Sequence, residues 1–369
     1  MATEGQSGGG GANSGEGRSF VDANRLRDLQ AFDDTRAGAK GLADAGVRHV
    51  PAIFHHHPDA LAPHAVSTRV AIPVIDLSGR RAEVVAAVKE AAETVGLFQV
   101  VAHGVPEAAM AGMLAAVRQF HEEPVEAKAR YYTRDAGRSV RYNCNTDLFQ
   151  APAARWRDTL YLDDPDKLAA EEPLPPACSG IVPRYTLLMR QLGRSLFGLL
   201  SEALGVRRGH LEEQAGCMEA VTMFAHYYPA CPQPELTLGA GRHSDPSFAT
   251  VLLQDSVGGL QVLVEEEEEG GSGPAWVDVP VVPGALVVNV GDFLQLVSNG
   301  RFHNVLHRVV AKDVGPRISV ACFFRANGAT VCAPVVDAGS GSQARYRTVT
   351  AEELLGSPRA QNRLRDLRL

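Results

Sequence analysis

The sequence has few cysteines, and none of them are arranged as a pair. The six lie far apart with no C-x-x-C motif (Cys144, Cys178, Cys217, Cys231, Cys322 and Cys332). Disulfide frameworks and structural zinc sites are read from closely spaced cysteines. We therefore exclude both and expect six reduced thiols that act as small packing residues.

Long apolar runs and dense basic blocks are also missing. A transmembrane helix needs about 20 mainly apolar residues, so none is expected. The formal net charge is −7, helped by the acidic run at 265–269, which disfavours nucleic-acid binding. Residues 1–18 are rich in Gly and Ser and lack the pattern of a secretory or transit peptide. These absences predict a cytoplasmic protein with no nucleic-acid partner and no membrane partner.

The first half of the sequence is predicted to be rich in α-helix. Apolar residues recur at a period near 3.6 over 82–94 and 184–204, and another helix is expected after Pro106. In the second of these stretches the apolar face includes Leu187, Leu188 and Leu192. Two β-type runs, 72–77 and 98–102, are interleaved with the helices and could extend a sheet.

From Val221 onward the pattern changes to short β-type runs separated by Gly, Pro and Asp. Such runs lie at 249–253, 259–264, 276–279, 285–290, 305–309 and 317–324. Many short strands with no helices between them predict a mainly β fold with flanking helices, built on a sandwich or jelly-roll barrel. The segment 265–273, EEEEEGGSG, is expected to be a hairpin tip.

One short motif in this β region suggests a metal site. His243 and Asp245 are two residues apart, and positions i and i+2 of a strand project to the same face. His307, in the run NVLHRVV, is the best-placed third ligand. Two His and one carboxylate form the facial triad of non-haem Fe(II) oxygenases. A second His-x-Asp match, His57 to Asp59, has a proline between its residues and is set aside.

His303 is an alternative to His307, because both could share a strand face. His303 follows the turn signal Asn299-Gly300 and is expected near the surface. His307 stands among apolar residues, where a buried ring needs a partner. The context therefore favours His307.

A second i, i+2 pair, Arg317 and Ser319, opens the apolar run RISVACFF. A buried guanidinium needs an anion. A dicarboxylate such as 2-oxoglutarate could chelate iron at its keto-acid end and bind Arg317 and Ser319 at the other. A structural Arg–Asp pair is the competing interpretation of Arg317 alone.

The motifs together resemble the plant 2-oxoglutarate/Fe(II)-dependent dioxygenases. Those in the second half are YYPACPQPELTLG (227–239), HSD (243–245), GGLQVL (258–263), PGALVVNVGDFLQLVSNGRF (283–302), HRVV (307–310) and RIS (317–319). Those in the first half are IPVIDLSG (72–79), VGLFQVVAHGVP (95–106), PVEAKARYYTRD (124–135) and WRDTLYL (156–162). The segment 29–54 is similar to the branch of 1-aminocyclopropane-1-carboxylate oxidase homologues.

The resemblance implies a double-stranded β-helix (jelly-roll) core after an α-rich N-terminal region. It divides the chain into a disordered tail (1–24), an N-terminal dioxygenase domain (25–175), an Fe(II)/2-oxoglutarate jelly-roll domain (176–335) and a C-terminal extension (336–369). It also implies Fe(II), 2-oxoglutarate as co-substrate, O2 and ascorbate as reductant. The implied activity is hydroxylation of a small plant specialised metabolite, a benzoxazinoid glucoside or another aromatic compound.

The resemblance also assigns individual residues. Tyr228 matches a tyrosine that touches 2-oxoglutarate, and His226 stands where the family usually has Asn. The region of Tyr142 and Asn143 borders the substrate pocket in relatives. Beyond Arg317 on the same strand, Phe323 and Arg325 are expected either to line that pocket or to be structural.

Two other functions fit parts of the pattern. A 1-aminocyclopropane-1-carboxylate oxidase proper shares the triad and the R-x-S pair but consumes ascorbate in place of 2-oxoglutarate. A catalytically silent binding module on the same barrel should have lost a metal ligand. The segment FDDT at 32–35 favours the homologue branch, and the complete triad disfavours the binding module.

Overall fold

The computed structural model describes residues 23–61, 71–168, 172–264, 274–336, 343–356 and 364–369. The expected tail up to residue 22 and the expected hairpin tip at 265–273 lie outside these residues. Ala23 and Asn24, assigned to the tail by the sequence, are instead the first residues of helix α1.

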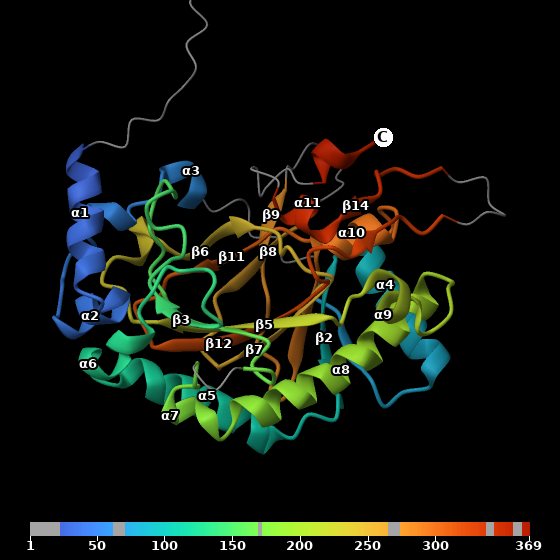
Figure 1. The fold of residues 1–369 in the computed structure, drawn as a ribbon, viewed down its shortest axis with the longest axis horizontal. Coiled ribbons are helices and arrows are strands. Elements are labelled where there is room, and N and C mark those ends of the chain that lie inside the picture. Colours follow the sequence, from blue (N-terminus) through green and yellow to red (C-terminus); the bar gives the residue numbers. More distant parts are fainter. Residues whose placement is uncertain (1–22, 62–70, 169–171, 265–273, 337–342, 357–363) are drawn as a thin grey trace, which may run out of the picture.

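The larger of two facing sheets has eight strands in the order β1-β2-β10-β7-β12-β5-β4-β3. Figure 1 shows its strands β5, β12 and β7 across the middle of the molecule. Their bounds are β1 Val74–Asp76, β2 Leu97–Val101, β3 Val140–Asn143, β4 Asp158–Asp163, β5 Ala220–Tyr228, β7 Ala249–Gln254, β10 Leu286–Val290 and β12 Arg317–Arg325. The pair β1 and β2 is parallel and the other neighbouring strands are antiparallel. Strands from both sides of the expected boundary at 175/176 share this sheet, and the division into domains stays a prediction.

The smaller sheet has the order β6-β11-β8-β9. Its strands are β6 Leu238–His243, β8 Leu260–Val264, β9 Ala275–Asp278 and β11 His307–Val310. Leu252 and Ala321 of the larger sheet pack in one cluster with Leu260 and Val309 of the smaller one. Side chains of the two inner faces therefore fill one barrel interior, which is the expected jelly-roll core.

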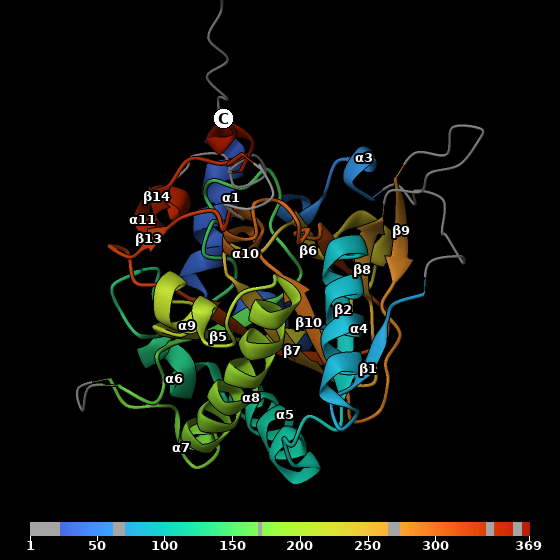
Figure 2. The same ribbon diagram turned by 90° about the vertical axis from the view of Figure 1, so that its right-hand side faces the viewer.

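Three long helices pack against the larger sheet on the side away from this interior (Figure 2). They are α4 Arg81–Thr94, α5 Glu107–Glu122 and α8 Val182–Ala203, close to the predicted positions. The buried stripe of α8 runs through Met189, Leu192 and Leu196 at helical spacing. Leu187 was expected on this stripe but is 55% exposed, because it falls on the opposite side of the helix.

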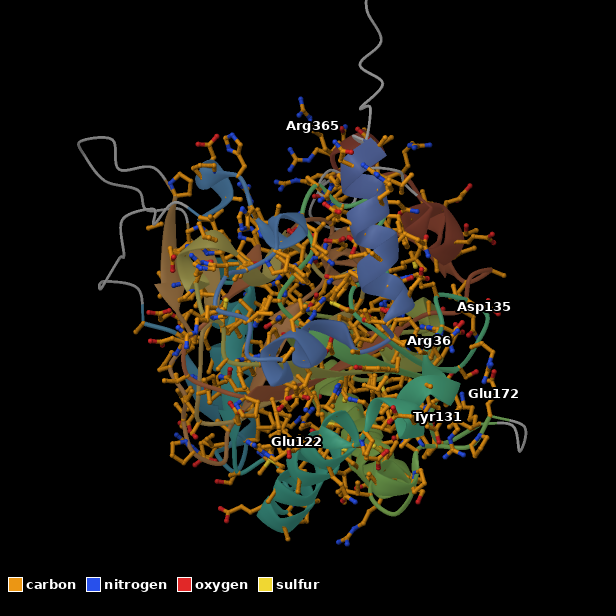
Figure 3. All side chains as sticks on the ribbon, turned by 90° about the vertical axis from the view of Figure 1, so that its left-hand side faces the viewer. Arg36, Glu122, Tyr131, Asp135, Glu172 and Arg365 are labelled. Atoms are coloured by element: carbon orange, nitrogen blue, oxygen red, sulfur yellow. The ribbon has the colours of Figure 1, made fainter. Side chains whose placement is uncertain are left out.

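The N-terminal helices lie at one end of the barrel, where α1 (Ala23–Asp34) runs along the edge of the molecule and Arg36 marks its lower end (Figure 3). Arg134 holds α1 through an ion pair with Asp33 at 2.7 Å. The next helix, α2 (Gly38–Asp44), begins on the buried carboxylate of Asp158, which accepts the backbone N–H groups of Ala39 and Lys40 at 2.8 Å each. This contact fixes the start of β4 against the N-terminal helices.

Shorter elements complete the described residues. The helices are α3 Pro58–Leu61, α6 Val125–Lys128, α7 Pro176–Ser179, α9 His210–Ala215, α10 Asp292–Val297 and α11 Ala351–Leu355; β13 Val331–Cys332 pairs with β14 Val349–Thr350. Helix α10 interrupts the region expected to hold strands alone, and β3 and β4 had no strand prediction. No helix among the described residues is long and apolar enough to cross a membrane.

Candidate functional site

Three side chains converge between the two sheets near one end of the barrel. His243 ends β6 and His307 begins β11, and the two are directly opposite each other in the register of these strands. The carboxylate Oδ1 of Asp245 lies 3.7 Å from His243 Nε2 and 3.5 Å from His307 Nε2. All three ligand atoms lie within 4.8 Å of one another, and no other such group occurs among the residues that the structure describes.

Asp245 reaches this group from a turn rather than from a strand. We expected His243 and Asp245 to share a strand face, but β6 ends at His243. The backbone oxygen of Asp245 accepts the N–H groups of Ser247 and Asp292 at 2.9 Å each, which holds the turn against the start of α10. The side chain still meets both imidazoles, so the spacing predicted the grouping while the reason for it was wrong.

Hydrogen bonds set the chemical form of the two imidazoles. Nδ1 of His243 lies 2.8 Å from the carbonyl oxygen of Gly241, and Nδ1 of His307 lies 3.2 Å from that of Val305. A carbonyl only accepts, so each Nδ1 carries a proton, and each Nε2 is the ring nitrogen left to face the other two side chains. Burial and the adjacent His307 lower the pKa of His243 to about 3, which keeps it neutral. Two imidazoles and a carboxylate fit a divalent transition metal.

Two further polar residues support the carboxylate. Asn289 Nδ2 donates to Asp245 Oδ2 at 3.4 Å, and Thr250 also bonds the carboxylate. Burial opposes ionisation of Asp245, but the two imidazoles and these hydrogen bonds outweigh it and lower its pKa. Asp245 is therefore ionised and oriented. Sequence analysis did not identify Asn289 or Thr250, although each lies in a predicted strand.

Arg317 and Ser319 lie at the other end of the same cavity, on the inner face of β12. Arg317 is 3% exposed, and its NH1 donates to Ser319 Oγ at 3.0 Å. Its Nε donates to the Gly258 carbonyl at 2.6 Å, and its NH2 donates to Gln254 Oε1 at 3.1 Å. These partners are neutral and no carboxylate among the described residues pairs with Arg317, so the structure lacks the Arg–Asp pair considered as the competing interpretation.

Tyr228 is adjacent to Arg317, whose guanidinium lies 4.8 Å from the centre of its ring. The cavity that joins the two ends is lined by Arg157, His226, Tyr228, Ala240, His243, Asp245, Thr250, Leu252, Leu260, Asn289, His307, Val309, Arg317, Ser319, Ala321 and Phe323. Three groups that could hold a metal and a buried guanidinium that could bind an anion therefore face one space. A ligand with two separated acidic ends could bridge them.

The four residues expected at the substrate pocket have different positions. Phe323 lines the cavity. Arg325 lies outside it, with its guanidinium 5.3 Å from the Phe323 ring. Tyr142 is fully buried against Phe120 and Tyr132, away from the cavity.

Asn143 is also fully buried and donates to the Thr133 carbonyl at 2.8 Å. The structure thus brings one of the four predicted residues to the cavity wall and makes Tyr142 and Asn143 packing residues. They sit on β3, the edge strand next to β4, and β3 does not reach the interior of the barrel.

His226 faces the cavity from near the C-terminal end of β5. Its Nδ1 lies 2.9 Å from Thr159 Oγ1. Burial, together with the nearby charges of Arg157 and Arg317, places its pKa well below the usual range, so the ring is neutral. A neutral imidazole held by a hydroxyl can offer a hydrogen bond to a ligand in the cavity.

Comparison with known proteins agrees with this geometry. Residues 220–326 match the model of the 2OG-Fe(II) oxygenase superfamily, and residues 72–178 match that of the non-haem dioxygenase in morphine synthesis N-terminal region. The 1-aminocyclopropane-1-carboxylate oxidase homolog 1 of Arabidopsis thaliana is 47% identical over 80% of this chain and 81% of its own length. The chain belongs to the 2OG-Fe(II) oxygenase superfamily.

Other members of the 2OG-Fe(II) oxygenase superfamily are also similar. Deacetoxyvindoline 4-hydroxylase of Catharanthus roseus is 44% identical over 81% of this chain and 75% of its own length. The crystal structure of JOX2 in complex with 2OG, Fe and JA is 26% identical with a TM-score of 0.75, covering 90% of this chain and 97% of that one. This chain is therefore an Fe(II)- and 2-oxoglutarate-dependent dioxygenase by family, of the branch that includes the 1-aminocyclopropane-1-carboxylate oxidase homologues.

Proposed function

We propose that this dioxygenase holds Fe(II) through His243, Asp245 and His307 and binds 2-oxoglutarate through Arg317, Ser319 and Tyr228. The observation that carries the proposal is the convergence of three ligand atoms within 4.8 Å, in a cavity whose other end holds a buried arginine with no carboxylate partner among the described residues. Fe(II) with 2-oxoglutarate would use O2 to form succinate, CO2 and a hydroxylated substrate. One oxygen atom of O2 would enter succinate and the other the new hydroxyl group.

The protein's own residues prepare this chemistry. The carbonyls of Gly241 and Val305 hold the Nδ1 protons, so both Nε2 lone pairs point to the metal position. Asn289 and Thr250 orient Asp245. Held by only three protein side chains, Fe(II) would keep positions open for the keto acid and O2. Arg317 would fix the far carboxylate, so that the keto-acid end reaches the metal in one orientation.

For the substrate we propose a small aromatic plant metabolite, and a benzoxazinoid glucoside in particular. The local motifs resemble the DIBOA-glucoside dioxygenase of grass benzoxazinoid synthesis. An aromatic cluster beside the metal position supports a ring-shaped substrate, since Phe224 lies 4.6 Å from Phe323 and 4.7 Å from Tyr161, centroid to centroid. Such side chains stack well on aromatic ligands.

The deciding experiment measures conversion of 2-oxoglutarate to succinate by the purified, iron-loaded protein with ascorbate present. The panel contains benzoxazinoid glucosides, other indole-derived glucosides, phenolics and 1-aminocyclopropane-1-carboxylate. Succinate and a hydroxylated product in equal amounts with an aromatic substrate would support the proposal. Ethylene formed from 1-aminocyclopropane-1-carboxylate without 2-oxoglutarate would indicate an oxidase proper. Ligand binding without turnover would indicate a binding module.

We further propose a cytoplasmic location, with no nucleic-acid or membrane partner. All six cysteines are free and buried, and free thiols are typical of a reducing compartment. Fractionation of the tagged protein with cytosolic and organelle markers tests this proposal.

A further inference from the structure

A second arginine, Arg157, faces the cavity from the residue just before β4. In the register of β4 and β5, Asp158 is opposite Tyr227, so Arg157 comes next to Tyr228. On the other side of β5, Arg317 is opposite Tyr228. The two arginines therefore flank one tyrosine across three neighbouring strands, and all three side chains line the cavity.

The guanidinium of Arg157 has no carboxylate partner in the part of the chain that the structure describes. Its carbon lies 6.0 Å from the centre of the Tyr228 ring, and the Tyr228 hydroxyl is its hydrogen-bond partner. Its Nε is buried without a partner. The nearby Asp147 is already committed to Arg155 through two contacts of 2.8 Å.

The charges on the cavity wall do not balance. Asp245 is the one carboxylate among the described lining residues, and it belongs to the metal-ligand group. Two arginines share this wall, and His226 between them and the metal end is neutral. An unpaired charge away from water is costly, so the arginine end of the cavity is built for a negatively charged ligand.

The register of the sheet shows how far the two arginines lie from the metal position. Four rows of inward side chains cross the larger sheet, and the row of Thr250 and Phe323 is nearest Asp245. The rows of Ala321 and of Ser319 follow, and Arg317 with Arg157 form the last. Both arginines thus lie at the end farthest from the metal. A substrate oxidised at the metal would meet the Phe323 row first.

We propose that Arg157 is a second guanidinium contact for the far carboxylate of 2-oxoglutarate, placed across Tyr228 from Arg317. The inference rests on the proposed function. Asp158 keeps Arg157 in place, because this neighbouring carboxylate binds the start of α2 and so fixes the entry to β4. The alternative ligand for Arg157 is an anionic group on the oxidised substrate, and comparing two keto acids in the absence of that substrate distinguishes the two.

The test compares two keto acids on full-length, Fe(II)-loaded protein under anaerobic conditions by titration calorimetry. One is 2-oxoglutarate, and the other is 2-oxopentanoate, which has the same chain without the far carboxylate. Arg157→Met should weaken 2-oxoglutarate binding by about tenfold to a hundredfold, as expected for a lost charged hydrogen bond, and leave 2-oxopentanoate binding within twofold. Arg157→Lys should fall in between, because it keeps the charge and loses the planar fork.

The exposed Arg194, which pairs with Glu212 on the outer surface, supplies the control, and Arg194→Met should change neither affinity. Unchanged 2-oxoglutarate binding in both Arg157 variants would overturn the inference. An equal loss of both keto acids, or a change in substrate KM alone, would also overturn it. If the unaltered protein fails to bind 2-oxoglutarate, the proposed function itself fails, whatever the variants do.

Discussion

At the scale of single residues, His303 and His307 lie four positions apart in different surroundings. His303 is exposed and its backbone N–H donates to the Ala92 carbonyl at 2.9 Å, whereas His307 is buried beside Asp245. We expect His307→Ala to abolish iron binding and turnover, because two remaining ligands hold the metal too weakly. His303→Ala should retain both within a few-fold. Iron stoichiometry and succinate yield for the two purified variants check this, and the reverse pattern would refute the assignment.

Arg317 allows a second prediction at this scale. If Arg317 binds the far carboxylate as proposed, Arg317→Leu should remove a bidentate, charge-assisted contact and raise the KM for 2-oxoglutarate, at a cost on the order of 2–5 kcal/mol. Ser319→Ala removes one neutral donor and should cost only about 0.5–1.5 kcal/mol. Steady-state kinetics with 2-oxoglutarate as the varied ligand measure both. An unchanged KM in the leucine variant would remove Arg317 from the role.

The sequence predicted the cavity residues that lie close together along the chain. His243 with Asp245, and Arg317 with Ser319, are local pairs. Arg157, Thr250 and Asn289 join the cavity only through the pairing of distant strands, and strand register depends on long-range packing that a single sequence does not display. Tyr142 and Asn143 were expected at the pocket by resemblance to relatives. Their burial away from the cavity depends on the same long-range strand pairing, which the sequence does not display.

At the scale of elements, two glycines test how α2 is seated. Gly38 and Gly46 both have positive φ, of 69° and 68°. A Cβ at Gly38 would lie 2.2 Å from Asp158 Oδ1, whereas a Cβ at Gly46 meets nothing within 4 Å. Alanine at either position should cost about 1–2 kcal/mol from the left-handed backbone. At Gly38 the clash of the new Cβ with the Asp158 carboxylate should destabilise the protein by about 1–3 kcal/mol more. Chemical denaturation of the two variants measures the difference in their unfolding free energies.

The anchor of α1 gives a prediction that depends on pH. Burial opposes ionisation of Asp33, but hydrogen bonds from Arg134 and Tyr132 outweigh it and lower its pKa. Because the pKa of Asp33 is lower in the folded state than in the unfolded state, its ionised carboxylate stabilises the fold at pH values above the unfolded pKa of about 3.9. This stabilisation is lost as the pH falls through the folded pKa. Asp33→Asn should therefore cost about 1.5–3 kcal/mol at neutral pH.

That difference should shrink toward zero as the solution is acidified below about pH 4. Unfolding free energies of both proteins, measured from pH 7 downward, test the expectation. A difference that is constant with pH would mean that the ion pair of Asp33 with Arg134 is not what secures α1.

Element prediction succeeded where one periodicity dominated. The amphipathic α4 and α8 and the apolar β7, β10 and β12 were found close to their observed bounds. Helix α10 has six residues, too few to show a helical repeat, and its sequence DFLQLV resembles a buried strand. Strand β4, with the sequence DTLYLD, alternates polar Thr159 and Tyr161 with apolar Leu160 and Leu162, so no single apolar run marked it in the sequence.

At the scale of the whole molecule, ligand binding should appear as stability. A ligand at a hundred times its Kd stabilises the native state by about 2.7 kcal/mol. Each kcal/mol is worth about 2 °C or less in Tm for a chain of 369 residues, because the shift falls with size from about 2–4 °C at 150–250 residues. Iron with 2-oxoglutarate should therefore raise Tm by several degrees, and a chelator should reverse the rise. Asp245→Ala should lack the shift, and a shift that survives in this variant would locate metal binding elsewhere.

The pairing of β2 with β10 constrains how the chain can fold during synthesis. Val100 pairs with Leu286, which is synthesised about 190 residues later, a delay of roughly 10–40 s at 5–20 residues per second. Until then β2 presents an unpaired edge, which is a template for aggregation. A nascent chain stalled before Leu286 should therefore depend on a chaperone, and N-terminal fragments ending there should be recovered as insoluble protein.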